Sequence, residues 1–276
     1  MRTTAVGAVA LVILASGGEV GPDRPEHAAS HVATAYGDRL VIGHRGDEAG
    51  AHTENTIASM RSAVAAGAGA VEFDVRVTAD DDFVVMHDSA LGRTTTCGGR
   101  VRAKTLGWIR TNCRGRHHRE PIPALTDVLD WARPSGVSLL VELKEAPGWD
   151  ADRTREVVDA IEDRGLELRA QFLSFETDLL ALVEQVAPGM QTLLIISGSR
   201  TPDLAVGRFD GVTIDPDEAT PGLVDQLHRL DMTVYGRTSN RPADWETFWQ
   251  AGVDGFLTDR PGAAADALPH TTGSHR

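Results

Sequence analysis

The chain has 276 residues, of which 41% are hydrophobic and 24% are charged, so its composition is that of a folded protein rather than a disordered one. This length suits a single α/β barrel, which typically needs about 250 residues. Acidic residues outnumber basic ones by 40 to 27, and the formal net charge is -13. We therefore expect no nucleic-acid partner, and an anionic ligand must be attracted by a metal or by a few local basic side chains.

Residues 1–17 have the pattern of a signal peptide. Arg2 supplies a positive charge, an apolar stretch runs from Ala5 to Ala15, and small residues follow at Ser16 and Gly17. The apolar run is shorter than the roughly 20 residues that a membrane-spanning helix needs. A buried N-terminal strand or helix is the alternative. We expect a secreted protein, in an extracellular or periplasm-like compartment, with an N-terminal extension over 18–38 and no stable membrane insertion.

From residue 40 onward, nine short β-rich runs alternate with helical patterns, which is typical of βα units around a parallel sheet. Most runs are near-continuously apolar, as expected for strands that are covered on both faces. The runs are 40–44, 71–77, 83–87, 138–143, 170–175, 192–196, 211–215, 233–236 and 255–258. The expected helices are 55–66, 125–132, 152–164, 177–186, 223–229 and 243–251.

The third run is predicted to be the antiparallel partner of the second. Only residues 78–82 separate them, and a parallel crossover needs a dozen residues or more. Setting this run aside leaves eight parallel strands, so we predict a (β/α)8 TIM barrel over residues 39–262. With a turn centred on Asp80 and Asp81, residue 87 pairs with residue 74, which brings His87 beside Asp74.

Residues 88–123, after the hairpin, are rich in Gly, Thr, Arg and Pro, with one short helical pattern around 105–110. We interpret this segment as an insertion over the barrel mouth. It contains Cys97 and Cys113, which are the chain's two cysteines and, in an exported protein, a plausible disulfide. Two unrelated free thiols are the alternative. Residues 263–276 are expected to form a flexible tail.

Polar side chains gather where the first strands end, which is where barrels of this kind place their active sites. Glu72 and Asp74 are two residues apart on one strand, so their carboxylates point to the same face. The side chains concerned are His44 and Arg45 after the first strand, Glu72 and Asp74 on the second, His87 after its return, and Glu142 and Lys144 on the next strand.

Three converging carboxylates repel one another unless a cation lies between them. Oxygen ligands alone favour Mg²⁺ or Ca²⁺ over zinc, so we expect one such ion. The two histidines suit general acid and base roles. Arg45 and Lys144 supply the local positive charge that a phosphate group needs.

The ordered motifs resemble the signature of the glycerophosphodiester phosphodiesterase family over about residues 40–261. They are His44-Arg45-Gly46, Glu54-Asn55-Thr56, Glu72-Phe73-Asp74-Val75, His87-Asp88, Arg93-Thr94, Val141-Glu142-Leu143-Lys144 and Thr258-Asp259-Arg260-Pro261. The resemblance implies hydrolysis of small glycerophosphodiesters to glycerol 3-phosphate and an alcohol.

The same resemblance implies a role for each candidate residue. Glu72, Asp74 and Glu142 would bind the metal, and His44 and His87 would be the acid–base pair, in an order that stays open. Arg45 and Lys144 would hold the phosphate, while Glu54 and Asn55 would lie behind the metal ligands or against the substrate. The nucleophile would be either water or the glycerol hydroxyl next to the phosphate.

Some positions depart from the family pattern. Thr53 stands where a proline is usual before Glu-Asn-Thr, and Asp82 stands where the hairpin turn usually has a glycine. Late in the barrel, Tyr235-Gly236-Arg237-Thr238 replaces a common Trp-Thr-Val-Asn, which makes Tyr235 the candidate aromatic contact for the glycerol side.

Two other functions are compatible with this barrel. A phospholipase D-like or sphingomyelinase D-like enzyme acting on intact lipids would need an apolar rim, for which Trp108 and Ile109 are the exposed candidates in the insertion. A non-catalytic binding module would have lost at least one catalytic position, whereas all of them are present.

Overall fold

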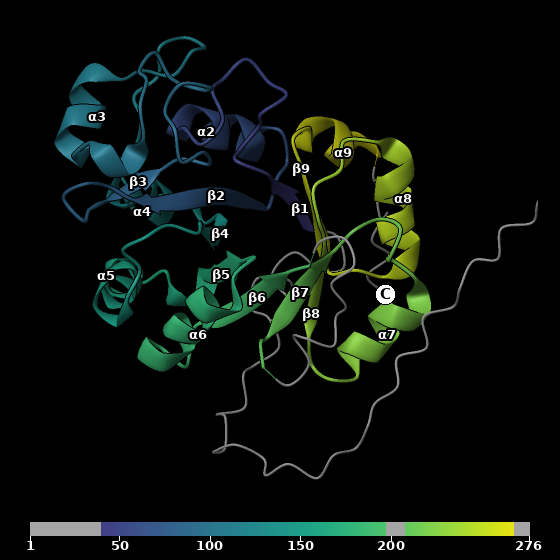
Figure 1. Ribbon diagram of the computed structural model, residues 1–276. Coiled ribbons are helices and arrows are strands. Elements are labelled where there is room, and N and C mark those ends of the chain that lie inside the picture. The colour runs from purple at the N-terminus through teal and green to yellow at the C-terminus, as the bar shows by residue number, and fades with distance from the viewer. Residues whose placement is uncertain (1–39, 197–207, 268–276) are drawn as a thin grey trace, which may run out of the picture.

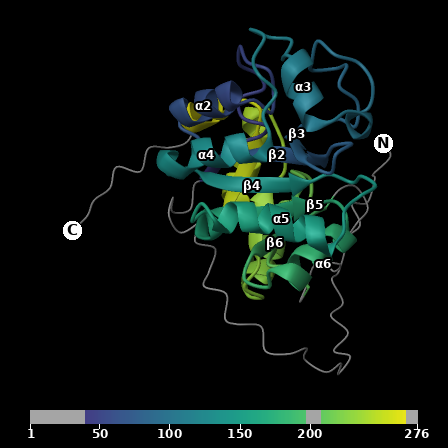
Figure 2. The same cartoon turned by 90° about the vertical axis from the view of Figure 1, so that its left-hand side faces the viewer.

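The computed structural model describes residues 40–196 and 208–267, so the predictions for residues 1–17 and 18–38 lie outside the described residues. The architecture is the predicted (β/α)8 barrel, with helices around a closed ring of parallel strands (Figure 1 and Figure 2). The ring closes because β1 pairs with both β9 and β2. Its strands are β1 (Leu40–Gly43), β2 (Ala70–Val77), β4 (Ser138–Leu143), β5 (Ala170–Ser174), β6 (Gln191–Ile195), β7 (Gly211–Ile214), β8 (Thr233–Gly236) and β9 (Gly255–Thr258).

The helices agree with the six predicted patterns to within a few residues. Hydroxyl side chains cap several of them; Thr56, for example, accepts a hydrogen bond from the Ser59 backbone N–H at the start of α2. The helices that cover the barrel are α2 (Ile57–Ala65), α4 (Leu125–Ser135), α5 (Ala151–Glu162), α6 (Thr177–Val186), α7 (Pro221–His228), α8 (Pro242–Ala251) and α9 (Pro261–Ala267), with a short 3₁₀ turn at Glu167–Arg169.

The strand alternation sorts side chains between two cores. Odd positions of β2, such as Val71, Phe73 and Val75, pack under the helices, whereas Ala70 lies in the apolar cluster inside the barrel. Because side chains alternate with a period of two, Glu72 and Asp74 continue the inward row of Ala70 toward the carboxyl end of the strand. Leu140 inside the barrel places Glu142 inward on β4 by the same rule. The predicted inward placement of these carboxylates is confirmed.

The return strand β3 (Phe83–Val85) is antiparallel to β2, as predicted, but its register differs by one residue. Val75 pairs with Val85, and the Met86 backbone N–H donates to the Asp74 carbonyl at 2.9 Å. The expectation that residue 87 pairs with residue 74 is therefore wrong. The turn is centred on Asp80 alone, because Thr78 bonds Asp82 through both its hydroxyl and its backbone N–H. These bonds close a five-residue loop in which Asp81 has a φ of 62°.

The insertion has a small core of its own. A 3₁₀ turn (Val101–Ala103) and helix α3 (Leu106–Asn112) pack on an apolar cluster that includes Leu91, Ile109 and Met86. A disulfide joins Cys97 and Cys113, with Cα atoms 5.3 Å apart. Ile109 is fully buried, so its expected exposure is wrong: it lies on the inner face of α3, while Trp108 beside it is 38% exposed.

The C-terminal segment is ordered further than expected. Helix α9 continues through residues 263–267, where a flexible tail was predicted, and buries Ala264 completely against β1 and its neighbours. Residues 268–276 lie outside the described part of the chain. Among the described residues, no helix combines the length and apolar character needed to cross a membrane.

Removing the disulfide should destabilise the insertion. Loop-closure entropy for a 16-residue separation stabilises the folded chain by about 3 kcal/mol, so Cys97→Ala with Cys113→Ala should lower the free energy of unfolding by about that amount. Urea titration measures this difference. Thiol titration of denatured, unreduced wild-type protein should find no free thiol, and two free thiols would contradict the pairing.

Candidate functional site

The turn after β1 presents its backbone to the barrel mouth. Arg45 has a left-handed backbone conformation with φ 52°, and its N–H donates to Glu72 Oε2 at 2.9 Å. Gly46 follows at φ 90°, and a Cβ atom there would lie 2.4 Å from Ser59 Oγ, so only glycine fits against α2. The His-Arg-Gly motif is therefore a tight turn that directs His44 and Arg45 toward the carboxylates.

Glu72, Asp74 and Glu142 form a compact acidic cluster. Asp74 and Glu142 are register partners across β2 and β4, and one oxygen from each of the three side chains lies within 4.8 Å of the others. All three are buried, and Glu72 Oε1 has no hydrogen-bond partner among the described residues. A buried carboxylate oxygen without a partner is costly. These residues fit a divalent cation held by oxygen ligands, as the sequence predicts.

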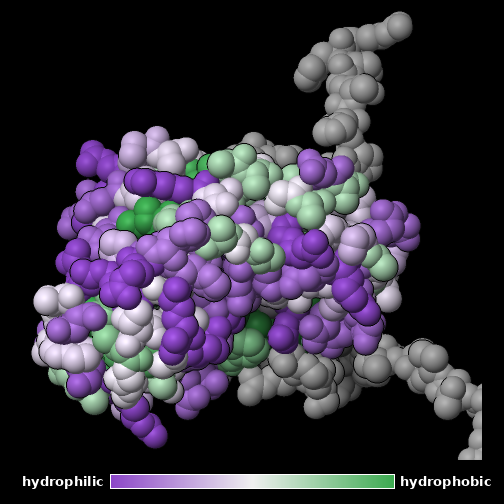
Figure 3. Space-filling view, turned by 90° about the horizontal axis from the view of Figure 1, so that it is seen from above, coloured by the Kyte–Doolittle hydropathy of each residue, from purple (hydrophilic) through white to green (hydrophobic). Residues whose placement is uncertain are grey.

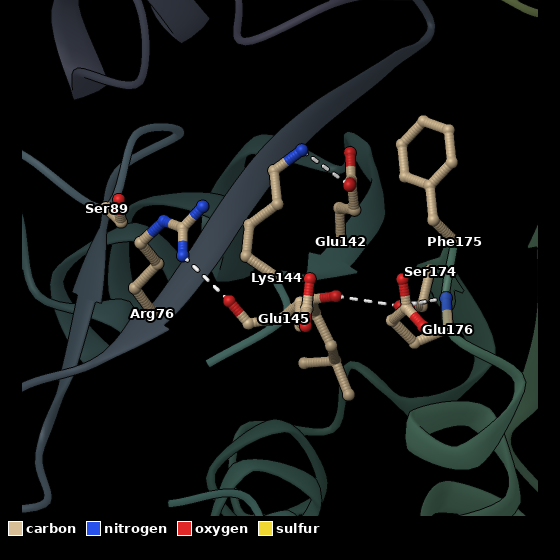
Figure 4. Close-up of a pocket in the computed structure, with 9 residues that line it drawn as sticks. Arg76, Ser89, Glu142, Lys144, Glu145, Ser174, Phe175 and Glu176 are labelled. Atoms are coloured by element: carbon tan, nitrogen blue, oxygen red, sulfur yellow. Dashed lines mark hydrogen bonds and ion pairs between the residues drawn. The ribbon is translucent and has the colours of Figure 1, made fainter. Parts of the chain in front are cut away.

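The two predicted phosphate ligands are paired with these carboxylates. Lys144 Nζ lies 2.9 Å from Asp74 Oδ1. It also lies 2.5 Å from Glu142 Oε1, and Figure 4 shows this second pair. Arg45 Nε lies 3.4 Å from Asp74 Oδ2. Both cations face the carboxylates at the site, where they offset the charge of the acidic cluster.

The carboxylates differ in how strongly they hold a proton. Burial, together with the negative charges of Asp74 and Glu142, raises the pKa of Glu72 well above its usual value. Burial and Asp74 raise the pKa of Glu142 to about 7. Burial opposes ionisation of Asp74 as well, but Lys144 and Arg45 hold its pKa below the ordinary range. Without an added cation, the site favours one fully ionised carboxylate over three.

Each predicted catalytic histidine has an aspartate on Nδ1. His44 Nδ1 lies 2.6 Å from Asp259 Oδ1, and its Nε2 lies 3.9 Å from Glu72 Oε2. His87 Nδ1 lies 2.7 Å from Asp88 Oδ1. Burial lowers the pKa of His87, although Asp74 opposes that effect. An acceptor on Nδ1 leaves Nε2 of each ring available for proton transfer.

Glu54 and Asn55 support the site from behind. Asn55, at φ 59°, donates from Nδ2 to Asp74 Oδ2 at 2.6 Å and accepts from the Asp74 N–H at 3.1 Å. Glu54 accepts two hydrogen bonds of 2.6 Å from Arg93 and lies 3.3 Å from Arg45. These contacts hold Asp74 and Arg45 in place, which agrees with the predicted supporting position of both residues.

A pocket of about 530 Å³ opens beside Glu142 and Lys144. Phe175 and Arg76 line it, and Figure 4 shows Lys144 and Glu142 pointing toward one another between them. Tyr235, the predicted aromatic contact for the glycerol side, does not line it. Tyr235 is fully buried inside the barrel, where its hydroxyl donates to Gln171 Oε1 at 3.0 Å, because its position in β8 points to the lower interior layer.

The roles of several site residues were missed by the sequence reasoning. Asp259 was named in a motif but given no role, although its place directly after the last strand was a usable signal for a partner of His44. Asn240 supports it, with Nδ2 2.5 Å from Asp259 Oδ2. Phe175 follows β5 directly. Asn240 lies in a loop without strand character, so no sequence pattern marked it.

Comparison with known proteins agrees with this geometry. The family model for the glycerophosphoryl diester phosphodiesterase family matches residues 44–263. The chain belongs to the glycerophosphoryl diester phosphodiesterase family. A glycerophosphodiester phosphodiesterase from Caldanaerobacter subterraneus subsp. tengcongensis is 31% identical over 230 residues, which are 80% of this chain and 94% of that protein.

Solved structures of the same family share the fold. A glycerophosphodiester phosphodiesterase from Agrobacterium tumefaciens str. C58 superposes with a TM-score of 0.73 at 24% identity, covering 83% of this chain and 99% of the other. A phosphodiesterase from Oleispira antarctica, solved with its product sn-glycerol-3-phosphate, gives a TM-score of 0.76 at 23% identity, covering 85% and 98%.

The Arg93 ion pairs should make stability depend on pH. Hydrogen bonds from Arg93 lower the pKa of Asp88 to about 2, below the ordinary value of about 3.9. A depressed folded-state pKa contributes stability that is complete above the unfolded-state pKa and is lost as the pH falls through the folded-state pKa. The melting-temperature difference between wild type and Arg93→Gln should therefore be largest near neutral pH and shrink on acidification from about pH 5 to about pH 2.

Arg61→Gln is the matched control, because Arg61 is exposed on α2. Its melting temperature should follow that of wild type across the same pH series. A difference for Arg93→Gln that stays constant with pH would show that Arg93 acts through packing alone.

Proposed function

We propose that this chain is a metal-dependent phosphodiesterase that hydrolyses glycerophosphodiesters to glycerol 3-phosphate and an alcohol. The observation that carries the proposal is the buried cluster of Glu72, Asp74 and Glu142 beside two histidines that each have an aspartate on Nδ1. Family membership and the relatives' printed activities support the same substrate class.

Glu72, Asp74 and Glu142 would hold Ca²⁺ or Mg²⁺, since all three offer only oxygen. When bound, such an ion supplies polarisation of a phosphoryl oxygen. With the carboxylate charge neutralised, Lys144 and Arg45 can turn part of their hydrogen-bonding capacity to the phosphate. Asn55 keeps Asp74 in position through its two hydrogen bonds.

His44 and His87 would carry the protons of the reaction. One takes the proton of the attacking hydroxyl or water, and the other gives a proton to the leaving alkoxide. Asp259 and Asp88 fix the ring orientation and leave Nε2 of each histidine for transfer. The intact-lipid alternative has less support, because Ile109, one of its two candidate membrane contacts, is buried.

Export is part of the proposal. Residues 1–17 have the positive charge, the short apolar stretch and the small residues after it that favour a signal peptide. The Cys97–Cys113 disulfide supports it, because disulfides persist in oxidising compartments outside the cytosol. The substrate would then be met as a small molecule outside the cell membrane or in a periplasm-like space.

Metal binding should be visible in stability as well as activity. Saturating Ca²⁺ or Mg²⁺ at about 100 times the dissociation constant should stabilise the wild type by about 2.7 kcal/mol. Glu72→Gln should lose this effect, yet be more stable than wild type without metal, because the wild type must either take up a proton at Glu72 or bury its charge beside Asp74 and Glu142 when it folds. Differential scanning calorimetry with and without metal measures both the stabilisation by metal and the difference between the two metal-free proteins.

Asp217→Asn, in an acidic group away from the cluster, is the control and should keep the wild-type response. An equal metal-induced rise in melting temperature for Glu72→Gln would place the ion elsewhere.

Catalysis should depend on both histidines. His44→Ala and His87→Ala should each lower kcat by about 10²- to 10⁴-fold with glycerophosphocholine, because general acid–base catalysis is worth that much. Release of glycerol 3-phosphate, followed by a coupled enzymatic assay, measures the rate. His228→Ala is the control. His228 also pairs with a carboxylate, since its Nε2 lies 3.1 Å from Asp254 Oδ2, but His228 lies at the end of helix α7 and not in the candidate site. Full activity of His44→Ala, or no release with any divalent ion, would refute the proposal.

A further inference from the structure

The insertion contacts the active-site loop through a buried carboxylate. Glu120 lies near the end of the insertion and is only 7% exposed, although the four residues before it, 116–119, are all exposed. The chain therefore turns back into the protein at this point. A carboxylate withdrawn from water is costly unless hydrogen-bond donors surround it, so the partners of Glu120 indicate what it does.

The Glu120 carboxylate is bound by the loop between β1 and α2. Thr53 Oγ1 donates to Glu120 Oε2 at 2.9 Å, and the Thr53 backbone N–H donates to Oε1 at 3.4 Å. His52 Nδ1 lies 3.1 Å from the same Oε1. Thr53 Oγ1 in turn accepts a hydrogen bond from the His117 N–H at 3.0 Å. The Glu120–Thr53 contact thus joins the insertion to the loop that leads from the His-Arg-Gly turn to α2.

The Glu120–Thr53 contact needs a glycine beside it. A Cβ atom at Gly115 would lie 2.5 Å from Thr53 Oγ1 and 2.8 Å from Glu120 Oε2, so both groups would have to move. The Gly115 N–H also donates to the Glu120 carbonyl at 2.8 Å. Cys113, two residues earlier, is tied by the disulfide. The insertion therefore holds Glu120 in a closely fitted position.

Thr53 is held at each of its polar groups. Its hydroxyl and N–H bond Glu120, while its carbonyl accepts a hydrogen bond from Thr56 Oγ1 at 2.7 Å. Because Thr56 is the N-cap of α2, Thr53 is tied both to the insertion and to the helix. Thr53 is 3% exposed, so water contributes little to fixing it. The loop therefore has a defined path where it enters residues 54 and 55.

This path matters because the next residues are strained. Asn55 has a φ of 59°, which residues other than glycine seldom adopt, and its backbone N–H donates to the Arg45 carbonyl at 2.9 Å. Its side chain bonds Asp74 at both ends of the amide. A strained residue persists only where the surrounding structure holds it. Glu120 supplies part of that support, through Thr53, two residues ahead of Asn55.

The outer surface of the insertion is polar. Figure 3, which looks down on the end of the molecule where α2 and α3 lie, shows mainly hydrophilic residues with small separate apolar patches. Trp108 is the one large hydrophobic residue of the insertion that is exposed, and Lys104 Nζ lies 4.1 Å from the centre of its ring. The buried inner contact with Thr53 is therefore the route by which the insertion can affect the reaction.

We propose that Glu120 is a positioning residue, which acts through Thr53 to hold Asn55, and with it Asp74, in the geometry that binds the metal. The inference rests on the proposed function. Glu120 acts through the loop and is not itself a metal ligand. Groups behind metal ligands typically change metal affinity or activity by about 10- to 100-fold when they are removed. The insertion is in this respect a working part of the active site.

The test removes either side of the Glu120–Thr53 contact. Glu120→Gln leaves one acceptor oxygen where the carboxylate has two, and Thr53→Val removes the hydroxyl. Each should weaken binding of Ca²⁺ or Mg²⁺, measured by calorimetric titration, by about ten-fold. Each should lower kcat with glycerophosphocholine to a similar degree and change KM little. Thr53→Ser keeps the hydroxyl and should behave as wild type in both measurements.

The double variant checks that the two residues act together. Thr53→Val combined with Glu120→Gln should lose no more metal affinity or kcat than the more damaged single variant, because both changes break one contact. Losses that add would show that Glu120 acts by another route and would overturn the inference.

Thr95→Val is the matched control. Thr95 is fully buried in the same insertion, and its hydroxyl donates to the Leu91 carbonyl at 2.8 Å, without contact to the site loop. This variant should lower the melting temperature but keep the wild-type metal affinity and kcat. An equal loss of both in Thr95→Val would show that Glu120 acts only through the stability of the insertion.

Hydrogen exchange in EDTA separates this inference from the proposed function. In Glu120→Gln, the Asn55 backbone N–H should exchange about ten-fold faster than in wild type, because the loop opens more often, while amides in the middle of α2 keep their rate. Unchanged exchange at Asn55 would overturn the inference. A faster exchange at Asn55 in Glu120→Gln, in a protein whose wild type neither binds a divalent ion nor hydrolyses glycerophosphocholine, would instead refute the proposed function and leave the support of Asn55 intact.

Discussion

The interaction on which this structure depends is the mutual repulsion of three carboxylates buried at one end of a barrel. Glu72, Asp74 and Glu142 face inward because their strands alternate, and they are so nearly buried that water screens their charge little. The fold responds by bringing cationic and amide groups to the same point. Lys144 arrives on the strand of Glu142, while Arg45 and Asn55 arrive from the loop after β1.

This requirement explains the unusual backbone around the site. Arg45 and Asn55 both have positive φ, a conformation that non-glycine residues seldom adopt. The Arg45 N–H to Glu72 and the two bonds between Asn55 and Asp74 stabilise those conformations. The hydrogen bonds to the buried carboxylates therefore help to offset the backbone strain.

The sequence was most informative where a short-range rule applies. Strand alternation placed Glu72 and Asp74 on one face, and the five-residue gap before Phe83 required a hairpin. It was less informative where geometry depends on a single turn bond, since the Thr78 hydroxyl moves the hairpin register by one residue. Tyr235 was misplaced because sequence shows that a strand residue points inward but not at which depth in the barrel it lies.

Contacts between distant segments were the hardest to foresee. Asp259, itself bonded by Asn240, meets His44 across nearly the whole chain, and only barrel closure brings β9 next to β1. The insertion is a similar case. Its charge could be read from composition, but which of its arginines are ion-paired depends on which carboxylates the fold places nearby.

Lys144 has one more consequence, which concerns the order of assembly. Its ammonium lies between Asp74 and Glu142, so the chain carries its own counter-ion for the carboxylate cluster. Small domains that rely on a structural metal stay unfolded until the ion arrives, because nothing else offsets their ligands. Here the ammonium of Lys144 offsets the carboxylate charge during folding. If the proposed metal binds, the barrel can be completed first and loaded afterwards, so the supply of the ion would limit activity without limiting the yield of folded protein.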